Sequence, residues 1–436
     1  MKILVDHGAY ENFGDLAMLE AALARLRTIP GVELAVQEAP VQWPWPGIRT
    51  MGYDIRPPGA TLRRFARARI LAGPPRAAMH AAARCWQLLA HHLAGLAGGT
   101  GAWPVRIAGG PQRLSQFCAQ FDALFVAGGG DLNDVFPQAL WRCCCLVRGF
   151  AAQGKPVFLS GQQIGPIRHA GSARLLRAAL RRATFVGVRE PGDSWRLATA
   201  AGLAGARLAL TGDDSLGLLP AAADAIDAAL AASGIGREPF LAVNIRIGPY
   251  VDVAADSLPA IARVLDGVAG RCRLPLLAVP ISVADEDSDL QAAEALARCL
   301  RRPLPILRGN RLSAALLKGV LGRAHGAIGM SYHFCTFALS QGVPAIALYA
   351  GDYYAQKAAG LADCWGDARL AEPIARLDDE APGRLLQLLG DEALRARLRE
   401  AAPMAARNWE DAFAAHVVRP LAGRAQAYLN SVKSSQ

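Results

Sequence analysis

Residues 123–134 have the sequence Ala-Leu-Phe-Val-Ala-Gly-Gly-Gly-Asp-Leu-Asn-Asp, an apolar run followed by three glycines and polar residues. A short apolar run bounded by glycine is typical of a fully buried strand. The glycines let the backbone approach a ligand, and Asp or Asn can cap a following helix. No Gly-Lys-Ser/Thr follows, so this is not a Walker A loop. A strand, a glycine loop and a helix in this order predict a parallel α/β domain.

The same order of buried strand, polar loop and helix recurs along both halves of the chain. A glycine- and proline-containing stretch, Gly234–Pro239, separates the two series and is the expected domain boundary. The expected strands lie at 3–5, 123–127, 156–160, 185–189 and 206–210 in the first series and at 240–245, 276–281, 305–307, 327–330 and 345–349 in the second.

The two series predict an α/β protein with two Rossmann-like domains facing a cleft, similar to the GT-B architecture. We expect the first domain at 1–233 and the second at 240–402, with a C-terminal helix at 403–436 that crosses back onto the first domain. In open α/β sheets, ligands bind beyond the carboxyl ends of the strands. The cleft is therefore the expected site.

Residues 40–115 interrupt this order with a basic helical insert. Trp43-Pro44-Trp45-Pro46 cannot form a helix. Basic helical stretches follow within 60–96. We favour an ordinary helical excursion on the surface, and the alternative is a peripheral contact with an anionic membrane or a lipid-linked acceptor.

The net charge of the 436-residue chain is +10, and only five of its 47 basic residues are lysines. We attribute this charge mainly to an arginine-rich composition, because no clustering of arginine with aromatic residues marks a nucleic-acid module. No nucleic-acid partner is expected. Arginine binds phosphate and carboxylate groups with two parallel hydrogen bonds, so the charge also suits a small anionic ligand. The oligomeric state is not predicted.

The N-terminus and the cysteines predict a cytoplasmic protein, with a place at the inner face of the membrane left open. The apolar run Ile3–Val5 is too short for a signal peptide, and no stretch approaches the roughly 20 apolar residues of a membrane span. Nine cysteines, an odd number, predict free thiols in a reducing compartment. Cys143-Cys144-Cys145 lacks the spacing of a zinc site, and no metal or cofactor is expected.

Three loops of the first domain carry candidate binding residues. Each follows an expected strand and contains glycine, which permits close approach of a ligand, together with side chains that recognise hydroxyl groups or anions. An ordinary capped turn is the alternative for each loop. The candidates for substrate binding here are Asn12, Gly14, Asp15, Gly129, Gly130, Asn133 and Gln162.

Four candidates lie in the second domain. Arg246 ends an apolar strand and needs an anionic partner if it is buried, either a ligand or a carboxylate of the protein. His333 lies where a strand passes into a helix, and imidazole suits proton transfer near neutral pH, so we take it as the catalytic candidate. Tyr349 and the rare Lys357 follow the next strand and are candidates for substrate binding.

Taken in order, these segments resemble the polysaccharide pyruvyl transferase family. The family patterns are an N-x-G-D turn, a GGG…ND loop, a GQGIGP-like loop, a vRdp segment and an aspartate at a strand end. They continue with an arginine at the end of a strand, an R-x-H…FAl…GvP segment and a Y…K element. The matching segments are Asn12–Asp15, Gly128–Asp134, Gly161–Pro166, Val188–Pro191, Asp213, Arg246, His333–Pro344 and Tyr349–Lys357.

The resemblance implies phosphoenolpyruvate (PEP) as donor and hydroxyls of a sugar, in a glycan or lipid-linked precursor, as acceptor. The product would be a pyruvyl ketal, with phosphate released, as in exopolysaccharide biosynthesis. It also implies His333 as the proton-transfer group and Arg246 and Lys357 as holders of the anionic donor. Two positions depart from the pattern. Gln163 stands where glycine is usual, and Ser331 stands where the family has arginine.

Two other functions stay open on the sequence. One is a GT-B glycosyltransferase that uses a nucleotide sugar, because the expected domain arrangement is the same. The other is a degenerate member that binds glycan without catalysis, which the departure at Ser331 motivates.

Overall fold

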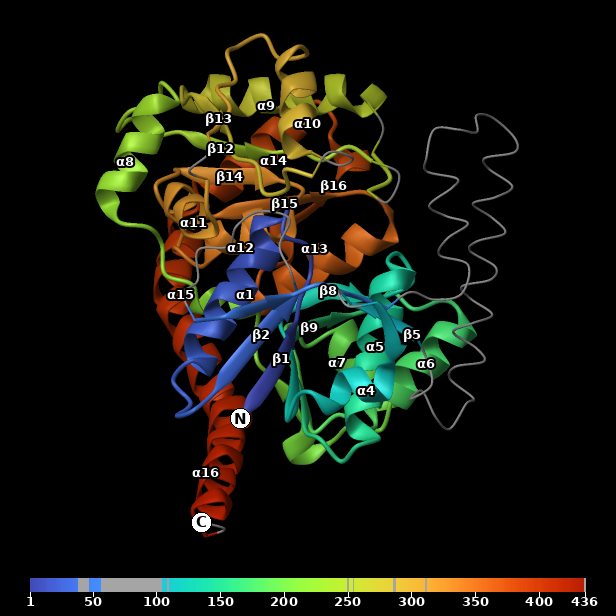
Figure 1. Cartoon of the computed structure of the whole chain (residues 1–436). Helices are drawn as coiled ribbons and strands as arrows, with labels where there is room; N and C mark the ends of the chain where they lie inside the picture. The colour runs from blue at the N-terminus through green and yellow to red at the C-terminus, as the bar shows by residue number, and fades with distance from the viewer. Residues whose placement is uncertain are drawn as a thin grey trace.

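The computed structural model describes residues 1–37, 47–55, 104–107, 110–248, 251–253, 255–284, 288–309 and 312–434. The predicted Trp43–Pro46 segment and the basic stretch at 60–96 lie outside the described residues. The described chain forms two α/β domains, each with its own parallel sheet, one above the other in Figure 1. The predicted fold class is confirmed.

The first domain contains a sheet of eight strands within the described residues, in the order β11-β10-β9-β7-β1-β2-β3, with β8 paired to β9. Its strands are β1 (Lys2–Asp6), β2 (Glu33–Gln37), β3 (Arg49–Met51), β7 (Ala123–Val126), β8 (Gly129–Leu132), β9 (Val157–Ile164), β10 (Phe185–Val188) and β11 (Leu208–Leu210). Its helices are α1 (Phe13–Leu26), α4 (Leu114–Ala119), α5 (Pro137–Ala151), α6 (Ala170–Leu180) and α7 (Asp193–Ala200).

Side chains of the first sheet alternate between two hydrophobic clusters, because successive residues of a strand point to opposite faces. Ile3 and Val5 of β1 pack with α1, whereas Leu4 packs with α5 and α6 on the other face. All three side chains are fully buried. A strand covered on both faces has to be apolar throughout, which explains the uninterrupted apolar runs in the sequence.

The described part of the insert adds a small antiparallel sheet beside the first domain. It consists of β4 (Tyr53–Asp54), β5 (Pro104–Ile107) and β6 (Gly110–Arg113). The Tyr53 hydroxyl donates a 2.7 Å hydrogen bond to Asp6 at the end of β1. This bond fixes β4 to the end of β1.

The second domain has five parallel strands in its described part, in the order β13-β12-β14-β15-β16. They are β12 (Leu241–Asn244), β13 (Leu276–Ala278), β14 (Gly326–Gly329), β15 (Ala345–Tyr349) and β16 (Ala371–Pro373). The helices are α8 (Ala223–Ala232), α9 (Leu258–Cys272), α10 (Asp289–Ala297), α11 (Ala314–Gly322), α12 (Tyr332–Leu339), α13 (Gly351–Trp365) and α14 (Ala381–Leu389). Helix α8, which precedes the expected boundary, packs against α11 of this domain.

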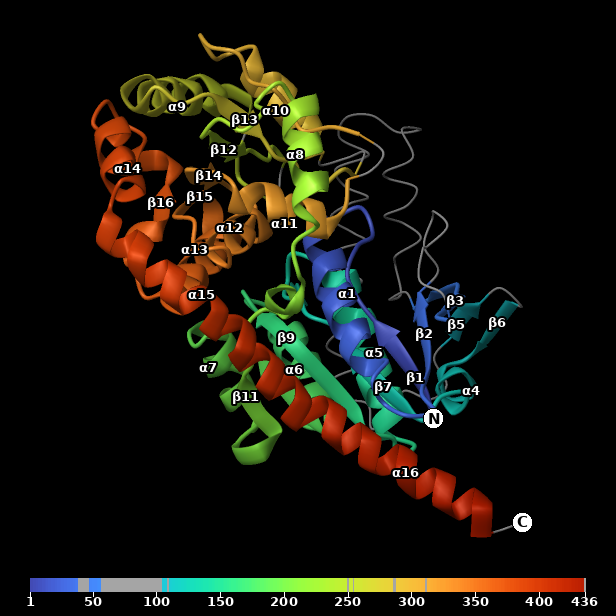
Figure 2. The same ribbon diagram turned by 90° about the vertical axis from the view of Figure 1, so that its left-hand side faces the viewer.

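The C-terminal helix returns to the first domain, as predicted. It comprises α15 (Glu392–Phe413), a π-helical turn (Ala414–Val418) and α16 (Arg419–Ser434). Figure 2 shows it running from the second domain along the first. Its buried side chains recur every fourth residue and therefore form one stripe, which joins the cluster around β1: Trp409, Phe413, Val417, Leu421 and Ala425.

The helix starts earlier than the expected residue 403. Asp391 caps it, because its side chain accepts a 3.0 Å hydrogen bond from the backbone N–H of Leu394. Pro403 therefore lies inside α15 rather than at its start. No described helix combines the length and the apolar character that crossing a membrane requires.

Candidate active site

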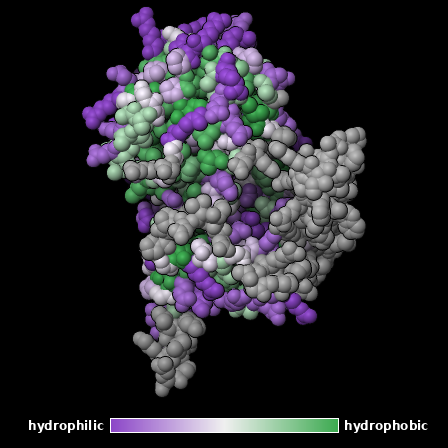
Figure 3. All heavy atoms as spheres, turned by 45° about the horizontal axis from the view of Figure 1, so that its top comes forward, coloured by the Kyte–Doolittle hydropathy of each residue, from purple (hydrophilic) through white to green (hydrophobic). Residues whose placement is uncertain are grey.

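The start of α1 joins the two domains at the carboxyl ends of their strands. Phe13 N–H donates a 2.8 Å hydrogen bond to the carbonyl of Ile281, and Val283 N–H donates one of 2.9 Å to Glu11. Asn12 caps the helix, because its side-chain oxygen accepts a 2.9 Å hydrogen bond from Gly14 N–H. In Figure 3, hydrophilic residues are visible near the middle of the face shown.

His333 lies in the first turn of α12 and packs against Gly14 of the first domain. A Cβ at Gly14 would overlap the imidazole, so this position requires glycine. His333 Nε2 lies 3.5 Å from Asp213 Oδ2, an ion-pair distance. Both side chains are buried. His333 therefore contacts two loops of the opposite domain.

Arg189 follows β10 and lies on the other side of Asp213. Its Nη1 is 3.5 Å from Asp213 Oδ2, and its Nη2 donates to Gln163 Oε1. Its guanidinium stacks 3.7 Å from the centroid of the Tyr332 ring. Burial acts to raise the pKa of Asp213, but His333 and Arg189 together hold that pKa below its usual value. Asp213 is therefore ionised at neutral pH.

Lys357 of α13 reaches the same region. Its ammonium lies 4.3 Å from the centroid of the Tyr353 ring and makes no hydrogen bond to another described residue. A Cβ at Gly130 would lie 3.3 Å from Lys357 Nζ, so the glycine loop approaches this ammonium closely. Burial and the charges of Arg189 and Arg246 lower the pKa of Lys357 to about 7.

Two carboxylates of the first domain face these cations. Asp15 Oδ2 accepts a 2.9 Å hydrogen bond from Ala9 N–H. Burial raises the pKa of Asp15, against the opposing charges of His333, Lys357 and Arg246. Burial and the neighbouring Asp15 raise the pKa of Asp131 to about 6. Groups that change protonation near neutral pH are suited to proton transfer.

Arg246 has a carboxylate of the protein as its partner. Its Nε and Nη2 lie 2.8 and 3.1 Å from the two oxygens of Asp289. Asp289 Oδ2 also accepts hydrogen bonds of 2.8 and 3.0 Å from the N–H groups of Ile281 and Ser282. Of the two partners expected for Arg246, the described structure contains the carboxylate. The charge of Arg246 still acts on Lys357, whose pKa it helps to lower.

Two predicted binding residues use their side chains inside the first domain. Gln162 is buried and donates hydrogen bonds of 2.7 and 2.8 Å to the carbonyls of Ala127 and Ser160. Asn133 is also buried and accepts from the N–H groups of Val135 and Phe136, at 2.8 and 2.9 Å. We therefore assign both amides to shaping the loops rather than to contacting a ligand.

The remaining predicted residues, Gly129 and Tyr349, lie at the edges of the group of charged side chains described above. Gly129 pairs with Gln162 between β8 and β9, and a Cβ there would meet no described atom within 4 Å. Tyr349 ends β15 opposite Pro373 of β16 and packs against the core of the second domain.

Four residues of this region were not among the predicted site residues: Asp131, Gln163, Arg189 and Asp213. Arg189 ends an apolar strand, the same signal that identified Arg246. Asp131 adjoins the predicted Gly130. Gln163 stands out in the sequence only as a departure from the family pattern, which usually has glycine there. We name Asp15, Arg189, Asp213, His333 and Lys357 the cleft cluster. No described group of His, Cys, Asp and Glu could hold a metal ion.

Comparison with known proteins agrees with this fold and sequence. The sequence model of the polysaccharide pyruvyl transferase family matches residues 12–352. The chain therefore belongs to this family. No curated protein matches the chain.

Solved structures show the same two-domain, GT-B-like fold at low sequence identity. A putative UDP-N-acetylglucosamine 2-epimerase from Listeria monocytogenes is 12% identical, with a TM-score of 0.54, over 95% of this chain and 96% of that chain. UDP-GlcNAc 2-epimerase from Neisseria meningitidis, bound to UDP-GlcNAc, is 9% identical, with a TM-score of 0.53, over 96% and 100%. TcCGT1 in complex with UDP is 11% identical, with a TM-score of 0.56, over 97% and 98%.

Proposed function

We propose that the protein transfers pyruvyl from PEP to two hydroxyls of a sugar, forming a ketal and releasing phosphate. Membership of the polysaccharide pyruvyl transferase family supports this reaction class. The observation that carries the proposal is the ammonium of Lys357. It makes no hydrogen bond to a described residue. The charges that act on it are the cations Arg189 and Arg246 and the carboxylates of Asp15 and Asp131.

PEP carries a phosphate and a carboxylate, and the cleft cluster offers positive charge for both. Lys357 is the group we assign to the anionic donor, and a lysine ammonium can bind phosphate as a point charge. Arg189 brings a second cation to the start of α12, next to Ser331, where the family has arginine. Arg246, held by Asp289, adds charge from the second domain.

The proposed chemistry needs a proton at C3 of PEP while C2 becomes electrophilic. In the first step C3 accepts a proton, the C2–C3 double bond becomes single, and a sugar hydroxyl bonds to C2 and loses its proton. In the second step the C2–O bond to phosphate breaks. A second sugar hydroxyl then bonds to C2, and this hydroxyl loses its proton. The balance is one PEP and two hydroxyls giving one ketal and one phosphate.

We assign His333 to proton transfer in this sequence. The ionised Asp213 facing it stabilises the positive charge that the imidazole carries when it is protonated. Asp15 and Asp131, whose pKa values are raised, are the candidates that accept protons from the hydroxyls. Asn12 and Gly14 contribute by fixing the start of α1 against His333.

Thermal unfolding in the presence of candidate donors tests the proposal. A ligand that binds only the folded protein raises the melting temperature. PEP is expected to protect the protein, whereas UDP and GDP are not. Protection by a nucleoside diphosphate without protection by PEP would instead identify a nucleotide-sugar glycosyltransferase.

A further inference from the structure

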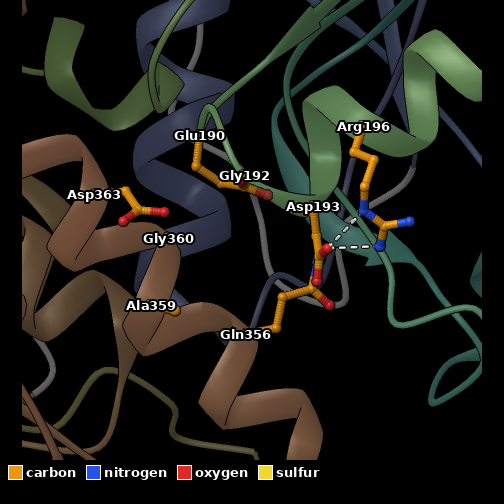
Figure 4. Close-up of a pocket in the computed structure, with 8 residues that line it drawn as sticks. All are labelled: Glu190, Gly192, Asp193, Arg196, Gln356, Ala359, Gly360 and Asp363. Atoms are coloured by element: carbon orange, nitrogen blue, oxygen red, sulfur yellow. Dashed lines mark hydrogen bonds and ion pairs between the residues drawn. The ribbon is translucent and has the colours of Figure 1, made fainter.

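A cavity of about 390 Å³ lies between the domains, next to the cleft cluster. Figure 4 shows residues of the loop after β10 and of α7 on one side and residues of α13 on the other. These elements follow the carboxyl ends of β10 and β15, where open α/β sheets bind ligands. The volume falls in the range of about 300–1,000 Å³ that is usual for small-molecule sites.

Glu190 is the buried polar group of this cavity. It is 2% exposed, and its Oε1 accepts hydrogen bonds from the backbone N–H and the hydroxyl of Ser194. Its Oε2 is buried beside Gly192. The Gly192 N–H acts on this carboxylate and lowers its pKa, but Oε2 makes no hydrogen bond of full geometry to a described residue. Burial raises the pKa of Glu190. A ligand that donates a hydrogen bond stabilises a buried oxygen that has no other hydrogen-bond donor.

A second unpartnered oxygen belongs to Gln356, on the facing helix. Its Nε2 donates a 2.9 Å hydrogen bond to the carbonyl of Ile164, which fixes the orientation of the amide. The Oε1 of the amide is a hydrogen-bond acceptor. That Oε1 is buried without a partner among the described residues. Two hydrogen-bond acceptors therefore line the same cavity, from different domains.

Three carboxylates and one guanidinium line the cavity, so its wall has an excess of negative charge. A Cβ at Gly192 would lie 3.3 Å both from Glu190 Oε2 and from Asp363 Oδ2, so the space above this glycine is flanked by two carboxylates. Asp193 is also at the wall, paired with Arg196 at 2.6 Å. Such a wall accepts hydrogen bonds and repels anions, so it does not suit PEP.

We infer that this cavity binds the acceptor, as a sugar ring without anionic groups whose hydroxyls donate to Glu190 and Gln356. The inference rests on the proposed function and adds the class of acceptor. Glu190 and Gln356 are neighbours in sequence of Arg189 and Lys357, so a sugar in the cavity lies next to the proposed donor site. A sugar with a carboxylate, such as a uronic acid, is excluded by the carboxylates of the wall.

The test of this inference is the binding of methyl glycosides to the full-length protein. Ligand-detected NMR titration in the presence of PEP measures that binding. The probes are the methyl glycosides of glucose, galactose and mannose, and those of glucuronic and galacturonic acid. At least one neutral glycoside is expected to bind, about tenfold or more tightly than the uronic acid of the same configuration. Absence of neutral-sugar binding, or equal binding of the uronic acids, would overturn the inference.

Glu190→Gln changes the chemistry of the cavity with little change in shape. The two donors of Ser194 hold the amide oxygen at the Oε1 position, so the amide NH₂ takes the place of Oε2 and an acceptor becomes a donor. We expect neutral-sugar affinity to fall about tenfold or more.

Asp363→Asn, at an exposed position, is expected to weaken discrimination against uronic acids. Asp224→Asn, on the exposed face of α8, is the matched control for the loss of a charge and should bind like the unchanged protein.

Protection by PEP separates this inference from the proposed function. If PEP protects the unchanged protein and Glu190→Gln equally, and Glu190→Gln also binds neutral sugars as tightly as the unchanged protein, the acceptor site is wrong and the donor assignment stands. If PEP does not protect the unchanged protein, the proposed function fails.

Discussion

His333 Nε2 and Asp213 Oδ2 lie 3.5 Å apart, and the two residues belong to different domains. His333 lies in the first turn of α12 of the second domain, and Asp213 follows β11 of the first. The contact between the proposed proton-transfer group and its charge partner therefore spans the two domains. The proposed chemistry depends on this contact between the domains.

Removal of either member of this pair is expected to abolish most of the turnover. His333→Ala removes the proton-transfer group, and general acid–base catalysis contributes about 10²- to 10⁴-fold to a rate. Asp213→Asn keeps the shape but removes the negative charge, so kcat should fall as well, with the donor KM little changed. Phosphate release from PEP measures the rate, and circular dichroism checks folding. Unchanged kcat in His333→Ala would refute its assignment.

Affinity for the donor should decrease as the pH rises through about 7, because the pKa of Lys357 lies there. The protonated ammonium attracts an anion, and the neutral amine does not, so the dissociation constant of PEP is expected to rise by up to about tenfold per pH unit above 7. Calorimetric titration between pH 6.5 and 9 measures this dependence.

The matched variant for this prediction is Lys357→Arg, which stays charged over the whole range. Its dissociation constant for PEP should vary little with pH. The same steep dependence in Lys357→Arg would show that another group causes it.

Arg246→Ala is expected to destabilise the fold more than it weakens donor binding. It leaves Asp289 buried without its cation, a change that typically costs about 3–5 kcal/mol. Urea unfolding measures this loss. Arg263→Ala, which breaks an exposed pair with Asp379 at 3.6 Å, is the control and should change stability by less than about 1 kcal/mol. Equal effects of the two substitutions would contradict the structural role of Arg246.

Trp409→Phe tests how the C-terminal helix is held on the first domain. Trp409 Nε1 donates a 2.8 Å hydrogen bond to Asp214 Oδ1, which also accepts one of 2.6 Å from Ser160. Phenylalanine keeps the ring in the core and removes this donor, so the free energy of unfolding should fall by about 1–3 kcal/mol. Met404→Ala, on the exposed side of the same helix, should have little effect. A loss below about 0.5 kcal/mol in Trp409→Phe would contradict this role.

The sequence predicted the two parallel sheets because strands buried on both faces are apolar throughout and end in glycine loops, as Ala123–Gly130 does. It did not bring Gln163, Arg189 and Asp213 together as one site. That requires the strand order β9-β10-β11, which no local pattern contains. The order places Gln163 of β9 and the residues that follow β10 and β11 side by side.

The hydrogen-bond and ion-pair partners of individual side chains could not be predicted from local sequence patterns either. The partner of Arg246 is Asp289, which is 43 residues away. Asp289 is the first residue of a helix, and several other acidic residues precede it in the sequence. Gln162 and Gln163 are adjacent, yet Gln162 binds backbone carbonyls and Gln163 accepts from Arg189. Which of two amides faces the cleft is decided by the alternation of side chains along β9, and the sequence does not reveal the register of that strand.

Binding of PEP to the unchanged protein and to Lys357→Met at pH 7, measured by isothermal titration calorimetry with UDP as the competing candidate, tests the central claim most directly. The cleft cluster predicts that PEP binds the unchanged protein, that Lys357→Met binds it about tenfold or more weakly, and that UDP does not bind. Binding of UDP with no binding of PEP would contradict the proposed function, and equal affinity of Lys357→Met for PEP would contradict the assignment of the donor to Lys357.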